Sequence, residues 1–202
     1  MSMKEPINFM LVGVGGQGTL LAANILAEVG LVAGYDVKKS EIHGMAQRGG
    51  SVSSHVRWGE QVFSPMAGKG EVDILLGFEM VEALRYIEFL RQGGRAILST
   101  HKIPPVAVTS GGAEYPSQAR FIGVVEQVTK DYLLVPAVEI AQELGNARAH
   151  NLVMLGALSV FLPVEEDIWL QVAPRHVPAK ALEVNLEAFR RGRALAGQAR
   201  KR

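Results

Sequence analysis

The sequence predicts an α/β fold: a Rossmann-like, doubly wound, mostly parallel sheet with helices on both faces. Continuous apolar runs at residues 7–12 and 72–78 are typical of strands that are buried on both faces. Between them, residues 19–33 repeat apolar side chains at helical spacing. Strands that alternate with helices favour parallel pairing, because each helix returns the chain to the same end of the sheet.

Composition predicts one globular domain over residues 1–202. Hydrophobic residues make up 48% of the chain, which is enough for a buried core. No apolar run reaches the roughly 18 residues that suggest a membrane span. The first residues also lack the apolar stretch of a signal peptide. We therefore expect a cytoplasmic protein that has no membrane segment.

The chain after the first helix predicts a β-hairpin insertion. A short second strand is expected at residues 37–40, followed by an irregular loop over residues 41–50. Residues 51–58 then alternate between apolar and polar side chains, as a half-buried strand does. Residues 59–60, Gly-Glu, are expected to turn the chain into residues 61–63. These last two strands would form the hairpin.

The second half continues the alternation of strands and helices. A helix over residues 81–91 is expected to end at the glycine pair 93–94, before a strand at residues 95–99. The two amphipathic helices at the end of the chain are expected to pack beside the sheet or to contact a partner subunit. The remaining elements are a helix at residues 117–129, a strand at 132–135, helices at 138–144 and 147–162, and the final helices at 165–172 and 178–191.

The charge of the chain is uneven. Its net charge is +1, yet residues 190–202 hold six basic side chains and no acidic one. A basic tail can bind nucleic acid or an acidic partner, but it is more typical of a solvated, flexible terminus, which we expect here. The rest of the chain has more acidic than basic residues and aromatic residues make up only 6%, so no nucleic-acid partner is expected.

The chain contains no cysteine. This excludes disulfides, zinc–thiolate sites and cysteine nucleophiles, and also an iron–sulfur cluster held by thiolates of this chain. The five histidines are scattered, and only His43 has an acidic residue, Glu41, at close spacing. Such a pair is more often structural than metal-binding. We expect no metal site and no catalytic residue within this chain.

A glycine-rich turn is the clearest local motif. Residues 13–18 read Gly-Val-Gly-Gly-Gln-Gly and lie between the first strand and the first helix. Glycines permit a tight turn and a close ligand approach, and the N–H groups at a helix start can hold a phosphate. The alternative is that these glycines serve packing alone. The candidate ligand-binding residues here are Gly13, Gly15, Gly16, Gln17, Gly18 and Thr19.

The residues near the second strand bear on which ligand the turn would bind. A dinucleotide fold usually places an acidic residue about 20 residues after the turn, to bind a ribose hydroxyl. Glu41 lies in this region, but two lysines, Lys38 and Lys39, precede it. The lysines favour a phosphorylated ligand other than NAD. The turn is also not a Walker loop, because Thr19 follows Gly18 with no lysine between them.

The connector at residues 41–51 is rich in hydrogen-bond donors. We expect it at the carboxyl edge of the sheet beside the glycine turn, where open α/β folds bind ligands. A compatible alternative is an ordered loop at a subunit interface. Glu79, after another strand, is interpreted as a helix cap rather than a ligand contact. The further candidate ligand-binding residues are Lys38, Lys39, Ser40, Arg48, Gly49, Gly50 and Ser51.

Nearly the whole chain resembles the gamma-type domain of 2-oxoacid:ferredoxin oxidoreductases. The most specific stretch is residues 40–51, Ser-Glu-Ile-His-Gly-Met-Ala-Gln-Arg-Gly-Gly-Ser, which is similar to the indolepyruvate branch of that family. The other stretches that carry the resemblance are residues 13–18, 33–37, 54–57, 72–79, 82–85, 144–146, 154–158 and 185–189, together with Asn151.

This resemblance implies a role as the small subunit in oxidative decarboxylation of a 2-oxoacid to its acyl-CoA. Thiamine diphosphate and iron–sulfur clusters would belong to a large alpha subunit, and ferredoxin would accept the electrons. The glycine turn and residues 38–51 would hold the phosphates of coenzyme A. Alternatives are a subunit for another 2-oxoacid, a stand-alone NAD(P)-binding oxidoreductase and a non-catalytic assembly subunit. The isolated chain could also form a homo-oligomer.

Overall fold

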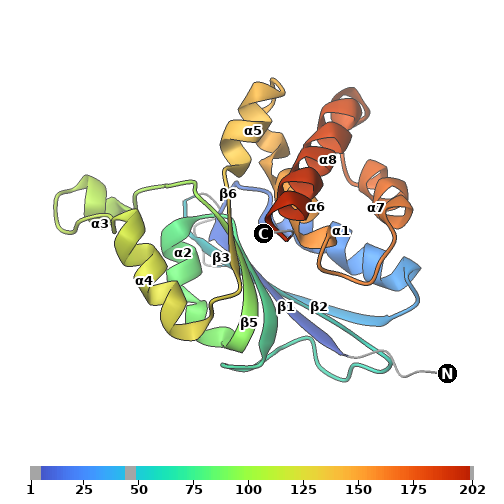
Figure 1. The fold of residues 1–202 in the computed structure, drawn as a ribbon, viewed down its shortest axis with the longest axis horizontal. Coiled ribbons are helices and arrows are strands. Elements are labelled where there is room, and N and C mark those ends of the chain that lie inside the picture. The colour runs from blue at the N-terminus through green and yellow to red at the C-terminus, as the bar shows by residue number, and fades with distance from the viewer. Residues whose placement is uncertain (1–5, 44–48, 201–202) are drawn as a thin grey trace.

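The computed structural model describes residues 6–43 and 49–200. Their strands form one twisted sheet in the order β2-β3-β1-β4-β5-β6 (Figure 1). Strands β1, β4, β5 and β6 run parallel, whereas β3 runs antiparallel to both of its neighbours. The strands are β1 (Ile7–Val14), β2 (Asp36–His43), β3 (Ser51–Gly59), β4 (Val72–Gly77), β5 (Leu90–Ser99) and β6 (Tyr132–Val135).

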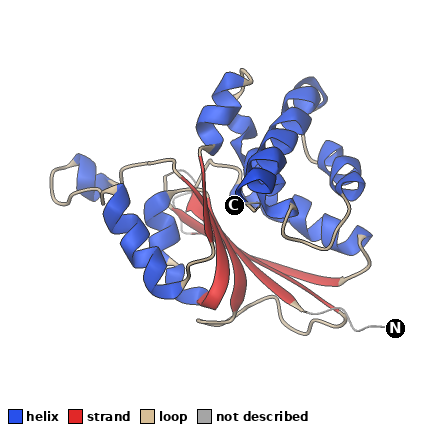
Figure 2. Cartoon of the chain, viewed as in Figure 1, coloured by secondary structure: helices blue, strands red, loops and turns tan. Residues whose placement is uncertain are grey.

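Helices cover both faces of the sheet, as predicted for a doubly wound fold (Figure 2). One core lies between the sheet and α1, α6, α7 and α8, and the other lies between the sheet, α2 and α4. The helices are α1 (Thr19–Val32), α2 (Met80–Arg85), α3 (Val106–Thr109), α4 (Gln118–Val128), α5 (Ala137–Glu143), α6 (His150–Ser159), α7 (Glu166–Val172) and α8 (Leu182–Ala199), with 3-10 turns η1 (Ile87–Phe89), η2 (Ala147–Ala149), η3 (Ala173–Arg175) and η4 (Ala179–Ala181).

The hairpin is made by strands other than those expected. β2 pairs with β3 along its whole length, from Asp36 opposite Gly59 to His43 opposite Val52. Because β1 and β2 occupy both edges of β3, no edge remains for residues 61–63, and the expected pairing of 61–63 with β3 is wrong. Val62 instead donates its backbone N–H to the Asp36 carboxylate at 2.7 Å.

The glycine pair at residues 93–94 does not separate a helix from a strand. Helix α2 ends at Arg85, and both glycines lie inside β5. Gly93 has a φ of 68°, and the pairing of β4 with β5 shifts register between Val72 and Ile74. The glycines therefore form an irregularity inside a strand, where a positive φ is needed, and not a helix stop.

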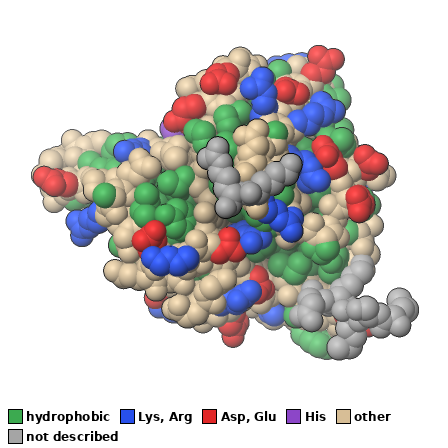
Figure 3. All heavy atoms as spheres, viewed as in Figure 1, with side chains coloured by type: hydrophobic (Ala, Val, Ile, Leu, Met, Phe, Trp, Pro, Cys, Tyr) green, Lys and Arg blue, Asp and Glu red, His purple; other side chains and the backbone are tan. Residues whose placement is uncertain are grey.

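The basic C-terminal segment is helical. α8 continues to Ala199, so residues 190–199 form helix where we expected a solvated terminus. Arg193 donates to Ser159 Oγ at 2.9 Å, and Arg200 donates to the Val160 carbonyl oxygen at 3.0 Å. Residues 201–202 lie outside the described residues. On the face in Figure 3, basic and acidic side chains are interspersed.

The crossing of α6 and α8 brings two backbones into contact. A Cβ atom at Gly156 would lie 1.9 Å from the Phe189 carbonyl oxygen, and one at Gly192 would lie 1.9 Å from the Val153 carbonyl oxygen. Both positions therefore require glycine. Neither these helices nor any other helix in the described part of the chain is long and apolar enough to cross a membrane.

Candidate functional site

The glycine turn is held in shape by a buried amide. Gln17 is 6% exposed, and its Oε1 accepts the backbone N–H of Val14 at 2.7 Å. Its Nε2 donates to the carbonyl oxygen of Phe78, just after β4, at 3.0 Å. Gln17 therefore joins the turn to the neighbouring parallel strand, and both ends of its amide are already used inside the protein.

Glycine serves different purposes along this turn. Cβ atoms at Gly13 and Gly18 would lie within 3.0 Å of neighbouring side chains, including Asn151 at Gly18. Gly16 has a φ of 103°, and a Cβ there would meet nothing within 4 Å. Packing therefore explains Gly13, and packing together with a φ of 76° explains Gly18. Gly16 instead faces open space, which a ligand can enter.

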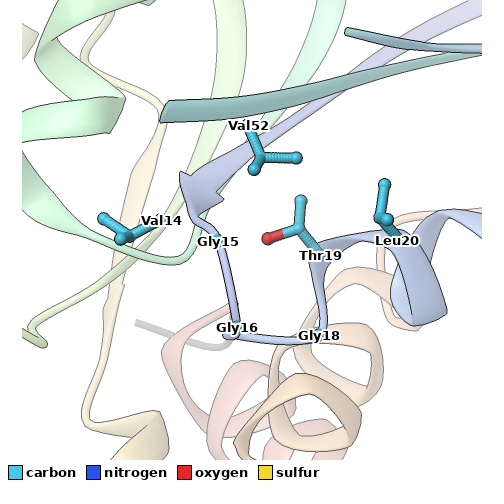
Figure 4. A pocket seen from close by; sticks show the side chains of 7 residues that line it. All are labelled: Val14, Gly15, Gly16, Gly18, Thr19, Leu20 and Val52. Carbon is cyan, nitrogen blue, oxygen red and sulfur yellow. The ribbon is translucent and has the colours of Figure 1, made fainter. Parts of the chain in front are cut away.

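A first cavity of about 520 Å³ opens on one side of the turn (Figure 4). Its apolar wall combines Val52 at the start of β3 with Leu20 at the start of α1. Thr19 also lines it, with a buried hydroxyl that has no hydrogen-bond partner among the described residues. The full lining is Val14, Gly15, Gly16, Gly18, Thr19, Leu20 and Val52.

A second cavity, of about 500 Å³, shares Gly16 and Gly18 with the first and extends to the starts of α6 and α8. It carries two basic side chains, Arg148 and Lys180. Among the described residues, no acidic side chain is part of its lining. The other lining residues are Gln17, Leu21, Asn146, His150, Asn151, Val177, Pro178, Ala181 and Asn185.

His150 forms part of the wall of this second cavity and is 8% exposed. Its Nδ1 lies 2.8 Å from the Ala147 carbonyl oxygen, which can only accept, so Nδ1 carries a proton. Its Nε2 has no hydrogen-bond partner among the described residues. Burial lowers the pKa of the imidazole, because the charged form loses hydration.

Two buried histidines are expected to make the fold sensitive to acid. Burial lowers the pKa of His150 and, together with the Arg57 charge, that of His55. The unfolded chain therefore binds protons at higher pH than the folded chain, and stability present above about pH 6.5 is lost as pH falls. Urea unfolding from pH 7.5 to 5 should show this decline. A His55→Gln, His150→Gln variant with the same slope would contradict it.

The structure brings the end of the connector to the glycine turn, as predicted. Gly15 donates its N–H to the Gly50 carbonyl oxygen at 2.8 Å, and Gly49 donates to the Gly15 carbonyl oxygen at 3.3 Å. Ser51 turns away from both cavities and donates its hydroxyl to the Glu82 carboxylate. Arg48 lies outside the described residues.

Lys38, Lys39 and Ser40 line neither cavity. They lie along β2, which β3 separates from β1 and its turn. The Lys38 ammonium lies 2.6 Å from Asp36, and that of Lys39 lies 2.5 Å from Glu41. The sequence predicts these lysines beside the turn, because the second strand of a Rossmann sheet normally pairs with the first strand. The inserted antiparallel strand moves them away.

Glu79 caps α2, as predicted. Its carboxylate accepts the backbone N–H of Glu82 at 2.9 Å and that of Ile103 at 3.1 Å. The Tyr115 hydroxyl also donates to it. No group of three or more histidine, cysteine, aspartate or glutamate side chains in residues 6–43 and 49–200 is arranged to hold a metal ion.

Known proteins that are similar in sequence identify the family. The sequence matches the family described as pyruvate ferredoxin/flavodoxin oxidoreductase over residues 8–195. Indolepyruvate oxidoreductase subunit IorB of Thermococcus kodakarensis is 43% identical over 193 residues, covering 94% of this chain and 95% of that protein. The chain belongs to the pyruvate ferredoxin/flavodoxin oxidoreductase family.

A second relative agrees in sequence, and a solved structure agrees in fold. Subunit IorB of Archaeoglobus fulgidus is 39% identical over 188 residues, covering 92% of this chain and 93% of that protein. The gamma subunit of keto/oxoacid ferredoxin oxidoreductase from Geobacter sulfurreducens has a TM-score of 0.70 at 22% identity, covering 95% of this chain and 99% of its own.

A larger chain contains the same fold. The 2-oxoglutarate:ferredoxin oxidoreductase of Magnetococcus marinus, a structure with 2-oxoglutarate, coenzyme A and succinyl-CoA bound, has a TM-score of 0.72 at 21% identity. The match covers 96% of this chain and 32% of that one. The fold thus occurs both as a separate subunit and as part of a longer polypeptide.

Sequence reasoning about this family member missed the cations of the second cavity. Arg148 precedes α6 and Lys180 precedes α8, more than 125 positions beyond the glycine turn. Arg148 lies shortly after Asn146, and Lys180 lies shortly after Pro178; Asn146 and Pro178 each begin a 3-10 turn. A cation close to the start of a helical segment was therefore the signal that the sequence offered. Their convergence on Gly16 is a tertiary feature, which no local pattern reports.

Proposed function

We propose that the chain is the small subunit of a 2-oxoacid:ferredoxin oxidoreductase that acts on indolepyruvate or a similar aryl 2-oxoacid. The observation that carries this proposal is the 43% identity to an indolepyruvate oxidoreductase subunit over nearly the full length of both chains. The proposed complex converts the 2-oxoacid to its acyl-CoA and passes electrons to ferredoxin.

The proposed complex divides the chemistry between two chains. A large alpha subunit would hold thiamine diphosphate for decarboxylation and iron–sulfur clusters for electron transfer. This chain has no cysteine to ligate such a cluster. Its own contribution is then to complete the complex and to bind coenzyme A at the glycine turn.

The residues of the turn fit coenzyme A. Gly16 leaves open space between the two cavities, so an extended ligand can cross the backbone there. The apolar wall of the first cavity suits the uncharged part of the coenzyme. A stand-alone NAD(P) enzyme is less well supported, because Glu41 is paired with Lys39 on the far strand.

Substrate preference of the two-chain complex tests the proposal. The chain should be co-expressed with the large subunit, and viologen reduction should be measured with indolepyruvate, pyruvate, 2-oxoisovalerate and 2-oxoglutarate, each with coenzyme A. The expected result is the highest kcat/KM for indolepyruvate and no turnover when the small chain is omitted. Preference for another 2-oxoacid would reassign the substrate, and equal activity of the large subunit alone would remove the catalytic role of this chain.

A further inference from the structure

Strand β2 forms one edge of the sheet, and its outer side pairs with no strand of the described residues (Figure 1). Because β2 pairs with β3 along its whole length, every second residue of β2 turns its N–H and C=O away from β3. The opposite edge strand, β6, has 4 residues, whereas β2 has 8. A long edge with unpaired backbone groups is a template for a further strand, so β2 is the edge that another chain can extend.

The charges on β2 do not protect this edge. Lysines on an edge strand commonly oppose pairing with another strand, and β2 carries two of them. The Lys38 ammonium, however, lies 2.6 Å from the Asp36 carboxylate. The Lys39 ammonium lies 2.5 Å from the Glu41 carboxylate. Each lysine is thus neutralised by an acidic residue of the same strand, and no excess of one charge repels an approaching strand.

The surface beside this edge exposes large apolar side chains. α1 packs along β2, and Asn24 of α1 accepts a hydrogen bond from the Lys39 ammonium. Leu20 and Leu31 lie on the same side of α1 as Asn24, four residues before it and seven residues after it. They are 37% and 56% exposed, and Ile42 on β2 is 47% exposed. Exposed apolar side chains next to a free edge indicate a surface that another protein covers.

A second copy of this chain fits the edge in one register. Opposed residues of an antiparallel pair turn their backbone groups either both toward each other or both away. Because these orientations alternate along β2, a two-fold axis must pass through a residue that faces its own copy. Lys38, Lys39 or Glu41 at the axis would put like charges opposite each other, and an axis nearer either end would leave most of β2 unpaired. Ser40 is the remaining position.

We propose that β2 joins two copies of this chain in an antiparallel pair about a two-fold axis at Ser40, so that the two sheets become one. Residues 37–43 of each copy pair in this register. Lys39 faces Glu41 of the second copy, and the two ion pairs already present become a ring of four alternating charges. Lys38 faces Ile42 of the second copy, whose exposed side chain the stem of the lysine can cover.

Sedimentation equilibrium of the full-length chain and its charge variants tests the dimer. The unmodified chain is expected to be dimeric. Lys39→Glu and Glu41→Lys each put like charges opposite each other at two symmetric positions, and each should weaken the dimer about tenfold. An equimolar mixture of these two variants should restore dimers, because every acidic side chain at these positions then faces a lysine. Loss of folding in either variant would not be rescued by mixing.

Lys130→Glu is the matched control for these variants. Lys130 also forms an ion pair, with Glu126 at 3.0 Å, but this pair belongs to α4, among the helices that cover the other face of the sheet. The control has the same change of charge and the same loss of an ion pair. It should leave the dimer unchanged.

The absence of cysteine in this chain allows a direct test of the register. Ser40 faces its own copy in the proposed dimer, and opposed Cβ atoms of antiparallel strands are about 4.5–5.5 Å apart. Under mild oxidation, Ser40→Cys should give a disulfide-linked dimer on a non-reducing gel. Ser110→Cys, at an exposed position after α3, should remain a single chain under the same conditions.

Two results would overturn the proposal. One is an unmodified chain that stays monomeric at its highest soluble concentration; slower hydrogen exchange of the β2 amides on addition of the large subunit would then identify that subunit as the occupant of the edge. The other is a dimer that neither charge reversal weakens, or that Ser40→Cys does not link, because its interface would then lie elsewhere or in another register.

Discussion

Replacing Gly156 with alanine is expected to cost about 3 kcal/mol or more of unfolding free energy, at the upper end of what overpacking a core costs. The added Cβ would lie 1.9 Å from the Phe189 carbonyl oxygen and 2.8 Å from its carbonyl carbon. These are backbone atoms of α8, so neither a rotamer change nor a side-chain shift relieves the clash. α6 and α8 must separate, although every residue of α6 is buried.

Urea unfolding and thermal melting measure this effect. The midpoint of melting is expected to fall by about 10 °C, given the usual change of roughly 2–4 °C per kcal/mol for a chain of this size. Gly192→Ala should behave similarly, because its Cβ would lie 1.9 Å from the Val153 carbonyl oxygen.

Two other helix glycines serve as matched controls. Cβ atoms at Gly197 on α8 and Gly123 on α4 would meet nothing within 4 Å. Alanine there is expected to stabilise each helix by up to about 1 kcal/mol, because alanine has the higher helix propensity. A Gly156→Ala variant with the same melting midpoint as these controls would contradict the close crossing of α6 and α8.

Replacing Gln17 with alanine is expected to destabilise the fold by about 2–4 kcal/mol and to weaken coenzyme binding. The substitution leaves the N–H of Val14 and the carbonyl oxygen of Phe78 without the partners that Gln17 supplies, and both groups are buried with this residue. Unpaired buried polar groups cost about 1–3 kcal/mol each. The glycine turn also loses its link to the strand beside it.

Coenzyme A affinity of the two-chain complex separates this local effect from general unfolding. At a temperature where the variant remains folded, Gln17→Ala should raise the KM for coenzyme A more than that for the 2-oxoacid, because the turn is the proposed coenzyme site. Gln142→Ala, at an exposed glutamine on α5, is the control and should change neither constant. Equal effects of Gln17→Ala on both constants would count against a coenzyme site at the turn.

Local chemistry accounts for most of what the sequence predicts correctly. The strand at residues 132–135 and the first helix are flanked by turn residues and have clear periodicity, and the structure places them where expected. The cap at Glu79 follows from a carboxylate next to a helix start. The contact of Gly15 with residues 49–50 agrees with the expectation that the connector lies beside the glycine turn. That expectation rested on the carboxyl edge of the sheet, where α/β folds bind ligands.

The wrong pairing of residues 61–63 has a physical cause, which is that strand pairing is non-local. The sequence of residues 51–59 does not indicate that both edges of this strand are paired with other strands. The nearest segment, residues 61–63, was therefore predicted as its partner. The same non-local pairing puts β3 between Lys39 on β2 and the turn after β1. Arg148 and Lys180 were missed because their cavity exists only after α6 and α8 pack beside α1.

This chain functions as the small subunit of an indolepyruvate/2-oxoacid:ferredoxin oxidoreductase. The most direct test of this role is affinity purification of the tagged chain from its native host, followed by assay of the eluate for viologen reduction. We predict a co-purifying large subunit with thiamine diphosphate and iron–sulfur clusters, and reduction that requires both indolepyruvate and coenzyme A. Recovery of this chain alone, with tight binding of a nicotinamide cofactor, would contradict the account.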